Sequence, residues 1–266
     1  MSFADYYSIK AVNWSTLRAM RVSPLAYKDI LATPVTETPA MVFGRAVHCA
    51  VLEPDRFPRD FLLWDGRRGT NDYKAFVLAA QDKTILGADD YERVLAVRDA
   101  VHRHPQARRY LRWGKPEVTL TWRDALTGLP CKARLDKLSR NWWLEFKTTR
   151  TLDAHDWGNR IAYMAYHGQL GFYSMGLEGL LWVPAVVIAA ESEPPFDVGV
   201  FPVPPDVLDE GVDLARELLD RVAQCRKSRR WPGRYPDATP LPFPAWARTG
   251  DGAGDYDSLK IEVLAR

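Results

Sequence analysis

The chain has 266 residues, a formal net charge of +2 and a hydrophobic content of 47%, which are typical of a globular protein with a buried core. It contains no stretch of about eighteen apolar residues and opens without a secretion-signal pattern, so we expect a cytoplasmic protein without a membrane span. Its three cysteines lack metal-ligand spacing, which argues against a disulfide framework, a zinc site and an iron–sulfur cluster.

The first 113 residues predict a mainly helical region. Ser23 and Pro24 divide its opening part into two short helices, because serine caps a helix and proline fits the first helical position. A later helix carries His48 and is closed by Pro54. Helices are expected at residues 14 to 31, 40 to 53, 72 to 82 and 88 to 112, with a loop rich in glycine and charge at 64 to 72.

Alternating apolar and polar residues then predict a cluster of strands. Thr127 and Gly128 form a turn between the first two, and Asp153 or Asp156 caps the helix that follows the third. A nearly continuous apolar run beyond this helix is typical of a buried strand. Strands are expected at residues 117 to 123, 130 to 138, 142 to 148, 181 to 190 and 196 to 203, and helices at 157 to 176 and 205 to 227.

Clustered strands followed by a helix that crosses to another strand predict an α/β fold, with a mixed central sheet flanked by helices. We expect a single domain over residues 1 to 266. Its parts are a helical N-terminal region at about 9 to 113, a core at about 114 to 231 and an irregular tail at about 232 to 266, which is rich in proline, glycine and aspartate.

Two neighbouring strands carry the most informative residues, Asp136 on one and Glu145 and Lys147 on the other. Side chains alternate between the faces of a strand, so Glu145 and Lys147 point the same way while Leu144 and Phe146 point into the core. Asp136 lies on the polar face of its own strand. We therefore expect two carboxylates and one ammonium group to converge.

This convergence suits hydrolysis of a phosphodiester. Hard divalent ions such as Mg²⁺ take carboxylate, water and phosphate oxygens as ligands, which Asp136 and Glu145 can supply in part. A bound ion lowers the pKa of an attacking water, and Lys147 orients that water or adds positive charge. The alternative is an exposed hairpin whose charged side chains are solvated or weakly paired.

Five further residues are candidates with alternatives. His48 alone is typical of a core histidine bonded to a backbone carbonyl. Glu117 is either an exposed acid at a strand end or part of a second metal or water site. Arg134 shares a face with the acidic residues and can contact phosphate or pair with a carboxylate. Gln169 and Tyr173 are four residues apart and so share a helix face.

Two basic stretches with aromatic residues, at 102 to 113 and 226 to 231, are candidates for contacting phosphates. Solvated helix faces or helix ends would explain either stretch equally well. His102 and His104 are two apart on an expected helix, where they would not face each other, so we do not expect a metal pair there.

The D, E-x-K arrangement resembles that of the PD-(D/E)XK nuclease superfamily, in its RecB-like branch, and is most similar to the RecE-type nucleases (the exonuclease VIII group of prophages). Four other segments carry this resemblance in the expected order, and Arg234 departs from it where the group usually has an aromatic residue. The segments are S-x-L and S-P-x-x-Y at 15 to 27, G-x-x-x-H-x-x-x-L-E-P at 44 to 54, Q-x-x-x-Y at 169 to 173, and W-P-G with L-P and a tryptophan at 231 to 246.

The resemblance implies a restriction-endonuclease-like core and a catalytic set of Asp136, Glu145 and Lys147. It implies that His48, Asp136, Glu145 and the carbonyl of Phe146 hold one Mg²⁺ ion, with Mn²⁺ as a substitute. Four residues are implied to bind DNA or support the site: Glu117, Arg134, Gln169 and Tyr173.

The implied activity is that of an exonuclease acting on double-stranded DNA ends, 5′ to 3′, which leaves single strand for a single-strand annealing protein. A homo-oligomeric ring of three or four subunits would keep it on DNA, since the P-loop signature of a motor is absent from the sequence. Two alternatives remain: a structure-specific or defence endonuclease, and a non-catalytic subunit that binds DNA ends.

Overall fold

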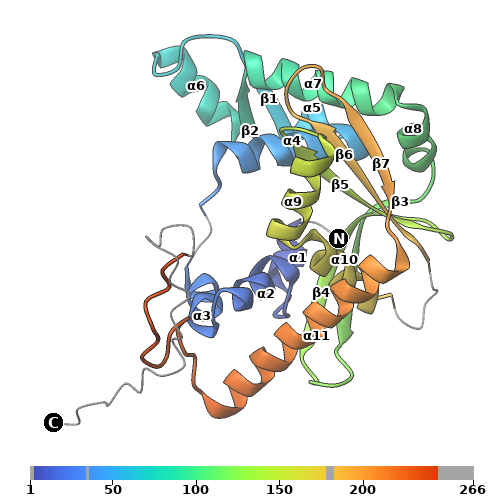
Figure 1. Ribbon diagram of the computed structural model, residues 1–266. Helices are drawn as coiled ribbons and strands as arrows, with labels where there is room; N and C mark the ends of the chain where they lie inside the picture. Colours follow the sequence, from blue (N-terminus) through green and yellow to red (C-terminus); the bar gives the residue numbers. More distant parts are fainter. Residues whose placement is uncertain (1–2, 34–35, 178–182, 245–266) are drawn as a thin grey trace, which may run out of the picture.

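The computed structural model describes residues 3 to 33, 36 to 177 and 183 to 244. Within them, a five-stranded sheet has the order β3-β4-β5-β6-β7 (Figure 1). The β5–β6 pair is parallel and the other neighbouring pairs are antiparallel, so the sheet is mixed, as predicted. The strands are β3 (Lys115–Arg123), β4 (Pro130–Leu138), β5 (Trp143–Thr149), β6 (Ala185–Glu191) and β7 (Val198–Pro202); residues 181 and 182 of the predicted fourth strand lie outside the described residues.

The parallel β5–β6 pair needs a crossover connection, which α9 (Ala154–Met164) and α10 (Tyr166–Met175) provide. Asp153 caps α9, as predicted, by accepting hydrogen bonds from two backbone N–H groups of its first turn. The prediction of one continuous helix at 157 to 176 is wrong, because Ala165 has a left-handed φ of 52° and separates the two helices. Helical spacing of apolar residues does not reveal such a break, which the packing of α10 imposes.

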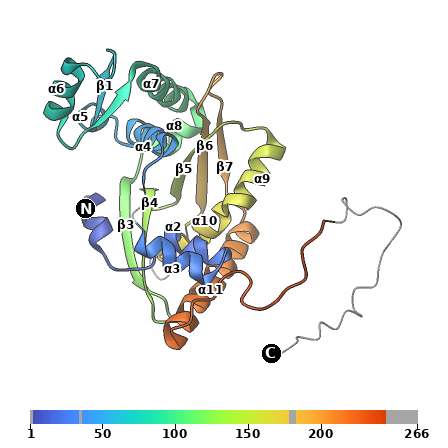
Figure 2. The same cartoon turned by 90° about the vertical axis from the view of Figure 1, so that its left-hand side faces the viewer.

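Each face of the sheet is covered by different helices. Leu144 and Phe146 of β5 pack with residues of α4 (Pro39–Leu52) and α7 (Ala88–Arg103) on one face. Trp143 packs on the opposite face, in a cluster that includes a residue of α10. Figure 2 shows α4 and α7 together at one end of the molecule and α11 at the other. Successive residues of β5 therefore point to two separate helical layers.

The N-terminal region is helical, as predicted. Ser23 accepts a hydrogen bond from the N–H of Ala26 and Pro24 occupies the first position of its helix, which confirms the predicted break. The helix expected at 88 to 112 is instead two helices, because the residue before Pro105 is held in an extended conformation. The remaining elements of the region are α1 (Phe3–Ser8), α2 (Trp14–Leu17), the 3-10 helix η1 (Arg18–Arg21), α3 (Pro24–Ala32), α5 (Phe57–Asp60), α6 (Asn71–Ala80) and α8 (Pro105–Leu111).

A small parallel sheet of β1 (Phe61–Trp64) and β2 (Thr84–Gly87), joined by α6, was not predicted. Each strand has only four residues, too few for alternation to be visible in the sequence. The Trp64 ring packs at 5.4 Å from Tyr73 and 5.0 Å from Phe76 of α6. This contact fixes the start of the loop predicted at 64 to 72.

The described part of the C-terminal tail, up to residue 244, has neither helix nor strand after α11 (Pro205–Ser228). It is nevertheless anchored, because the Trp231 ring stacks on Tyr27 at 5.8 Å and the Leu25 N–H donates to the Pro232 carbonyl. The later tryptophan of the matched ending, Trp246, lies outside the described residues. No helix in the described parts is long and apolar enough to cross a membrane.

Helices α10 and α11 approach closely through two glycines. A Cβ atom at Gly171 would overlap the backbone of Gly211, and one at Gly211 would overlap the carbonyl of His167. The missing side chains let the two backbones meet, and this contact sets the position of α10 against the sheet.

Gly171→Ala should therefore lower the free energy of unfolding by about 3 kcal/mol, because neither backbone can yield without moving a helix. The matched control is Gly158→Ala in α9, where a Cβ meets no atom within 4 Å. The control should raise stability by about 0.5–1 kcal/mol, since alanine is the better helix former. Denaturant unfolding of both variants measures the difference, and equal effects would contradict the packing argument.

Candidate active site

The site lies where β4 and β5 part. The two strands pair at only two positions near their hairpin, whereas β5 pairs with β6 along its whole length. Beyond this short ladder, Asp136 Oδ2 accepts a hydrogen bond of 2.5 Å from the backbone N–H of Phe146. The Asp136 carboxylate thus accepts the hydrogen bond that a backbone carbonyl of β4 would accept in a regular sheet, and so bridges the opening between the strands.

The pairing of β3 with β4 is also interrupted at Asp136. Glu117, which would face it, has no partner in the β3–β4 register and has a left-handed φ of 54°. Leu135 and Leu138 pack in the same hydrophobic cluster, although strict alternation would place them on opposite faces. The alternation therefore shifts by one residue at Asp136. Local irregularities of this kind redirect side chains and are common beside active sites.

This shift corrects the predicted geometry. We expected Asp136, Glu145 and Lys147 on one face of two regular strands. Instead, Asp136 lines a pocket with His48 and Glu117, while Glu145 and Lys147 line a second pocket next to α10. The acidic groups still interact across the opening, because Asp136 is among the charges that raise the pKa of Glu145.

His48, Glu117 and Asp136 form a compact group of potential ligands. One donor atom from each lies within 4.8 Å of the others, and His48 Nδ1 is 3.6 Å from Asp136 Oδ1. Burial is the main cause that lowers the pKa of His48, which favours the neutral imidazole that metals bind. The backbone of Phe146 is a hydrogen-bond partner of the same ring. The structure thus brings His48 and Phe146 to Asp136, as the resemblance implied.

Glu117 and Arg134 form a nearly buried ion pair beside this group. Arg134 Nε donates to Glu117 Oε2 at 2.5 Å, and their side chains are 9% and 13% exposed. Arg134 therefore pairs with a carboxylate, one of the two roles that we considered. Glu117 is not an exposed acid at a strand end, since its carboxylate belongs to the ligand group.

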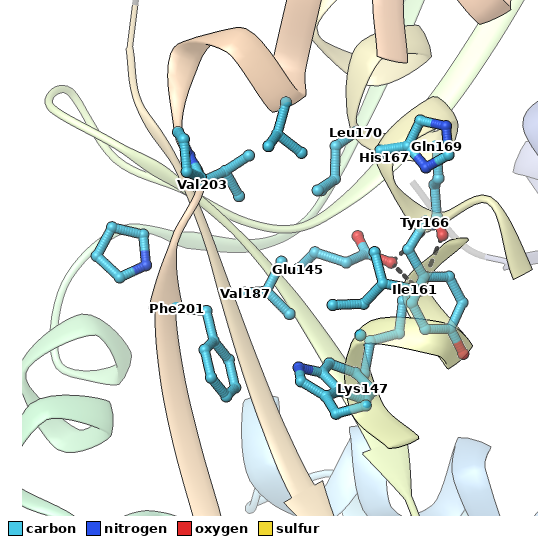
Figure 3. A pocket seen from close by; sticks show the side chains of 15 residues that line it. Glu145, Lys147, Ile161, Tyr166, His167, Gln169, Leu170, Val187, Phe201 and Val203 are labelled. Carbon is cyan, nitrogen blue, oxygen red and sulfur yellow. Dashed lines mark hydrogen bonds and ion pairs between the residues drawn. The ribbon is translucent and has the colours of Figure 1, made fainter. Parts of the chain in front are cut away.

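On the other side of the opening, Lys147 is held in a hydrogen-bond network. Its Nζ donates to Glu145 Oε1 at 2.6 Å and to Gln169 Oε1 at 2.9 Å. Gln169 Nε2 in turn donates to Glu145 Oε1 at 2.7 Å and to the Tyr173 hydroxyl at 3.0 Å. Figure 3 shows Glu145, Lys147 and Gln169 turned toward one another. The helix face that Gln169 and Tyr173 share thus orders the lysine.

Burial dominates the electrostatics of these groups. It raises the pKa of Glu145 to about 7, with a further contribution from Asp136, and it also raises the pKa of Asp136 together with Glu117. For Lys147, burial lowers the pKa, but Glu145 and Asp136 outweigh it and the net pKa is raised. Lys147 therefore stays protonated. The ionised forms of Glu145 and Asp136 cost free energy that Lys147 alone does not offset, and a second cation would lower this cost.

A divalent cation fits this donor set. Glu145 Oε2 is buried and makes no hydrogen bond within the described residues, although its partner oxygen makes two. An orphaned carboxylate oxygen, two more carboxylates and a neutral imidazole match the ligands of Mg²⁺ or Mn²⁺. His48, Glu117 and Asp136 form the compact group that could hold the ion, and Glu145 would join them from across the opening through its Oε2.

Sequence analysis missed Tyr6, which lines the same pocket as His48 and Asp136. Burial raises the pKa of its hydroxyl to about 12. Its backbone carbonyl accepts a hydrogen bond from Lys132 Nζ at 2.8 Å, which fastens α1 to β4. No spacing in the sequence links Tyr6 to residues more than forty positions away, so only the folded chain reveals this contact.

Because the ionised form of Glu145 is disfavoured by burial, we expect Glu145 to lower the stability of the metal-free protein and to contribute to metal binding. A carboxyl whose pKa is raised in the folded state weakens folding as pH rises from about 4.5 to about 7, so at pH 8 the full cost is present. Glu145→Gln should raise the melting temperature of the metal-free protein at pH 8 by about 5 °C. It should also remove most of the rise in melting temperature that Mg²⁺ or Mn²⁺ causes in the wild type.

Glu92→Gln, at an exposed position of α7, is the matched control and should change neither value. Differential scanning calorimetry with and without metal reads both effects. A metal-induced rise that survives Glu145→Gln unchanged would remove Glu145 from the ligand set.

Comparisons with known proteins agree with this geometry. Residues 13 to 238 match the family described as "PDDEXK-like domain of unknown function (DUF3799)". The crystal structure of a "Putative exonuclease" from Eubacterium rectale superposes with a TM-score of 0.62 at 12% identity, over 86% of this chain and 88% of that one, which shows a shared fold. A structure named SSO0001 covers 78% of this chain and 84% of its own at 16% identity, with a TM-score of 0.29 that is too low to support any argument. No curated protein matches the sequence.

The family match spans most of the chain, including both sides of the opening between β4 and β5. The mixed sheet flanked by helices is the restriction-endonuclease-like fold that the resemblance implied. The fold is shared with the solved structure, and the chain belongs to the PDDEXK-like family, which supports a nuclease.

Proposed function

We propose that the protein is a Mg²⁺-dependent exodeoxyribonuclease, with Mn²⁺ as a substitute. It degrades one strand of linear double-stranded DNA from an end, 5′ to 3′, and leaves single strand for an annealing protein in the cytoplasm. The observation that carries the proposal is the partly buried Lys147, which Glu145 and Asp136 keep protonated and Glu145 and Gln169 hold in place, next to a group of potential metal ligands. A lysine held in this way beside buried carboxylates is typical of a functional site.

The residues divide the work of the reaction between them. Lys147 Nζ, with one donor left beyond its two bonds, can orient an attacking water or an oxygen of the scissile phosphate. Gln169 and Tyr173 fix the lysine, and Arg134 offsets the charge of Glu117. His48, Asp136 and Glu145 would hold a divalent cation, which would supply Lewis-acid charge and lower the pKa of a water next to it.

The two basic stretches differ in how well the structure supports contact with DNA. Arg108, Arg109 and Arg112 are exposed around a hollow of about 690 Å³ that Trp113 also lines. In the second stretch, Trp231 is used for packing on Tyr27. We therefore assign the phosphate contacts to the first stretch, which would face the DNA in a ring of three or four subunits.

Substitution of Lys147 tests the catalytic assignment. Lys147→Ala should lower kcat on linear duplex DNA by about 10³-fold, because it removes a preorganised positive donor, while KM changes little. The control is Lys115→Ala, an exposed lysine at the start of β3, which should leave kcat unchanged. Asp136→Asn should cause a comparable loss. Near wild-type kcat in Lys147→Ala would contradict the assignment.

The substrate is tested with linear duplexes labelled at one end at a time, with and without Mg²⁺, beside a covalently closed circle. Release of label from 5′ ends that depends on Mg²⁺, with the circle intact, supports the proposal. Release of label from 3′ ends only would show that the enzyme degrades DNA 3′ to 5′, against the proposed direction. Cleavage of the circle would instead show an endonuclease, and DNA binding without cleavage would show the non-catalytic alternative.

A further prediction concerns assembly. Light scattering at micromolar concentration should give a mass of three or four chains, since a closed ring retains DNA without a motor. Arg109→Ala should weaken DNA binding for every sequence and reduce the slope of log K against log salt by about 1. A monomer that degrades long duplexes without releasing them would contradict the ring.

A further inference from the structure

An apolar pocket adjoins Lys147 on the side away from His48. It has a volume of about 260 Å³ and lies between the α9–α10 junction and the strands β6 and β7. Glu145 and Lys147 form part of its wall, and Figure 3 shows Val187 and Phe201 across from Tyr166 and Ile161. We call it the base pocket; its main lining residues are Trp157, Ile161, Tyr166, Leu170, Val187 and Phe201.

Aromatic rings dominate one part of the base pocket. Trp157 lies 6.0 Å from the Tyr166 ring and 6.0 Å from the Phe201 ring, and all three come from different elements. Lys147 Nζ lies 4.9 Å from the centre of the Tyr166 ring, so the aromatic side of the pocket is directly next to the proposed catalytic lysine. Rings of this kind stack with any nucleobase, because every base has a π-face.

Trp157 contributes its ring to the pocket wall. The residue is only 4% exposed, and its Nε1 is buried without a hydrogen bond within the described part of the chain. Because this nitrogen is covered, Trp157 offers a ligand its apolar ring and not a hydrogen bond.

We propose that the base pocket receives an unpaired nucleobase of the strand being cut. The inference rests on the proposed function, since it places the scissile phosphate at Glu145 and Lys147. A single sugar joins a base to its phosphate, so the base must lie next to these residues, where the base pocket is found. A base still paired in the duplex cannot enter, and the enzyme must therefore act on a strand end that has opened.

The chemistry of the pocket also predicts its selectivity. Its lining is mostly apolar and its aromatic rings can stack with any base, so it can accept any of the four bases. A charged group such as a phosphate is disfavoured by the apolar part of this lining. Recognition should depend on the presence of a base and not on its identity.

The test compares duplexes that end in a short unpaired overhang with duplexes that carry an abasic residue at either of the first two nucleotides. Wild-type kcat/KM should fall about tenfold on the worse abasic substrate, the loss expected for one stacked base. Phe201→Ala should lower kcat/KM on the normal substrate and remove most of this difference. Phe201 is 37% exposed, so its truncation should leave the fold intact.

Tyr163→Ala is the matched control, since this aromatic residue of α9 is 82% exposed and does not line the pocket. It should keep the full discrimination against abasic DNA. A second variant, Ile161→Trp, fills the pocket from α9 and should behave like Phe201→Ala.

A binding measurement separates this inference from the proposed function. In the Lys147→Ala protein, a 2-aminopurine base at the sensitive position should lose fluorescence on binding, and Ile161→Trp should prevent that loss while DNA is still bound. Cleavage by the wild type with equal rates on normal and abasic ends would overturn the base pocket and leave the nuclease standing. A protein that neither cuts nor binds DNA would overturn both.

Discussion

Two buried carboxylates meet at the opening between β4 and β5, and the surrounding structure follows from the need to hold their charge. Burial raises the pKa of both carboxyls, with a further contribution from Glu117 for Asp136 and from Asp136 for Glu145, so the ionised form of each is disfavoured in the metal-free protein. The chain offsets this cost in part with Lys147 and with a backbone N–H. Within the described residues it leaves Glu145 Oε2 without a hydrogen bond, and a metal ion could occupy that position.

The opening also explains why two helices on opposite faces of the sheet serve one site. Helix α4 brings His48 to Asp136 from one face, and α10 brings Gln169 to Glu145 and Lys147 from the other. The close contact of α10 with α11 through glycine fixes the second group. In our account the first group holds the metal together with Glu145, while Gln169 orders Lys147 beside the base pocket.

Sequence patterns were sufficient for the sheet and most helices, because alternation and caps are local signals, and short motifs singled out residues that the structure places around the opening. They failed where tertiary contacts override the local pattern. The left-handed residue at Ala165, the strands of the small β1–β2 sheet and the position of Tyr6 have no local signal. The shift of alternation at Asp136 also went unseen, since it depends on the pairing of β4 with two neighbours at once.

The central claim is that groups from both sides of this opening bind one metal ion. Crystals soaked in Mn²⁺ test it directly, since anomalous scattering locates the ion without reference to activity. The account predicts a peak within bonding distance of His48, Asp136 and Glu145, next to the carbonyl of Phe146. A fully occupied Mn²⁺ peak elsewhere, with these side chains unbound, would contradict it.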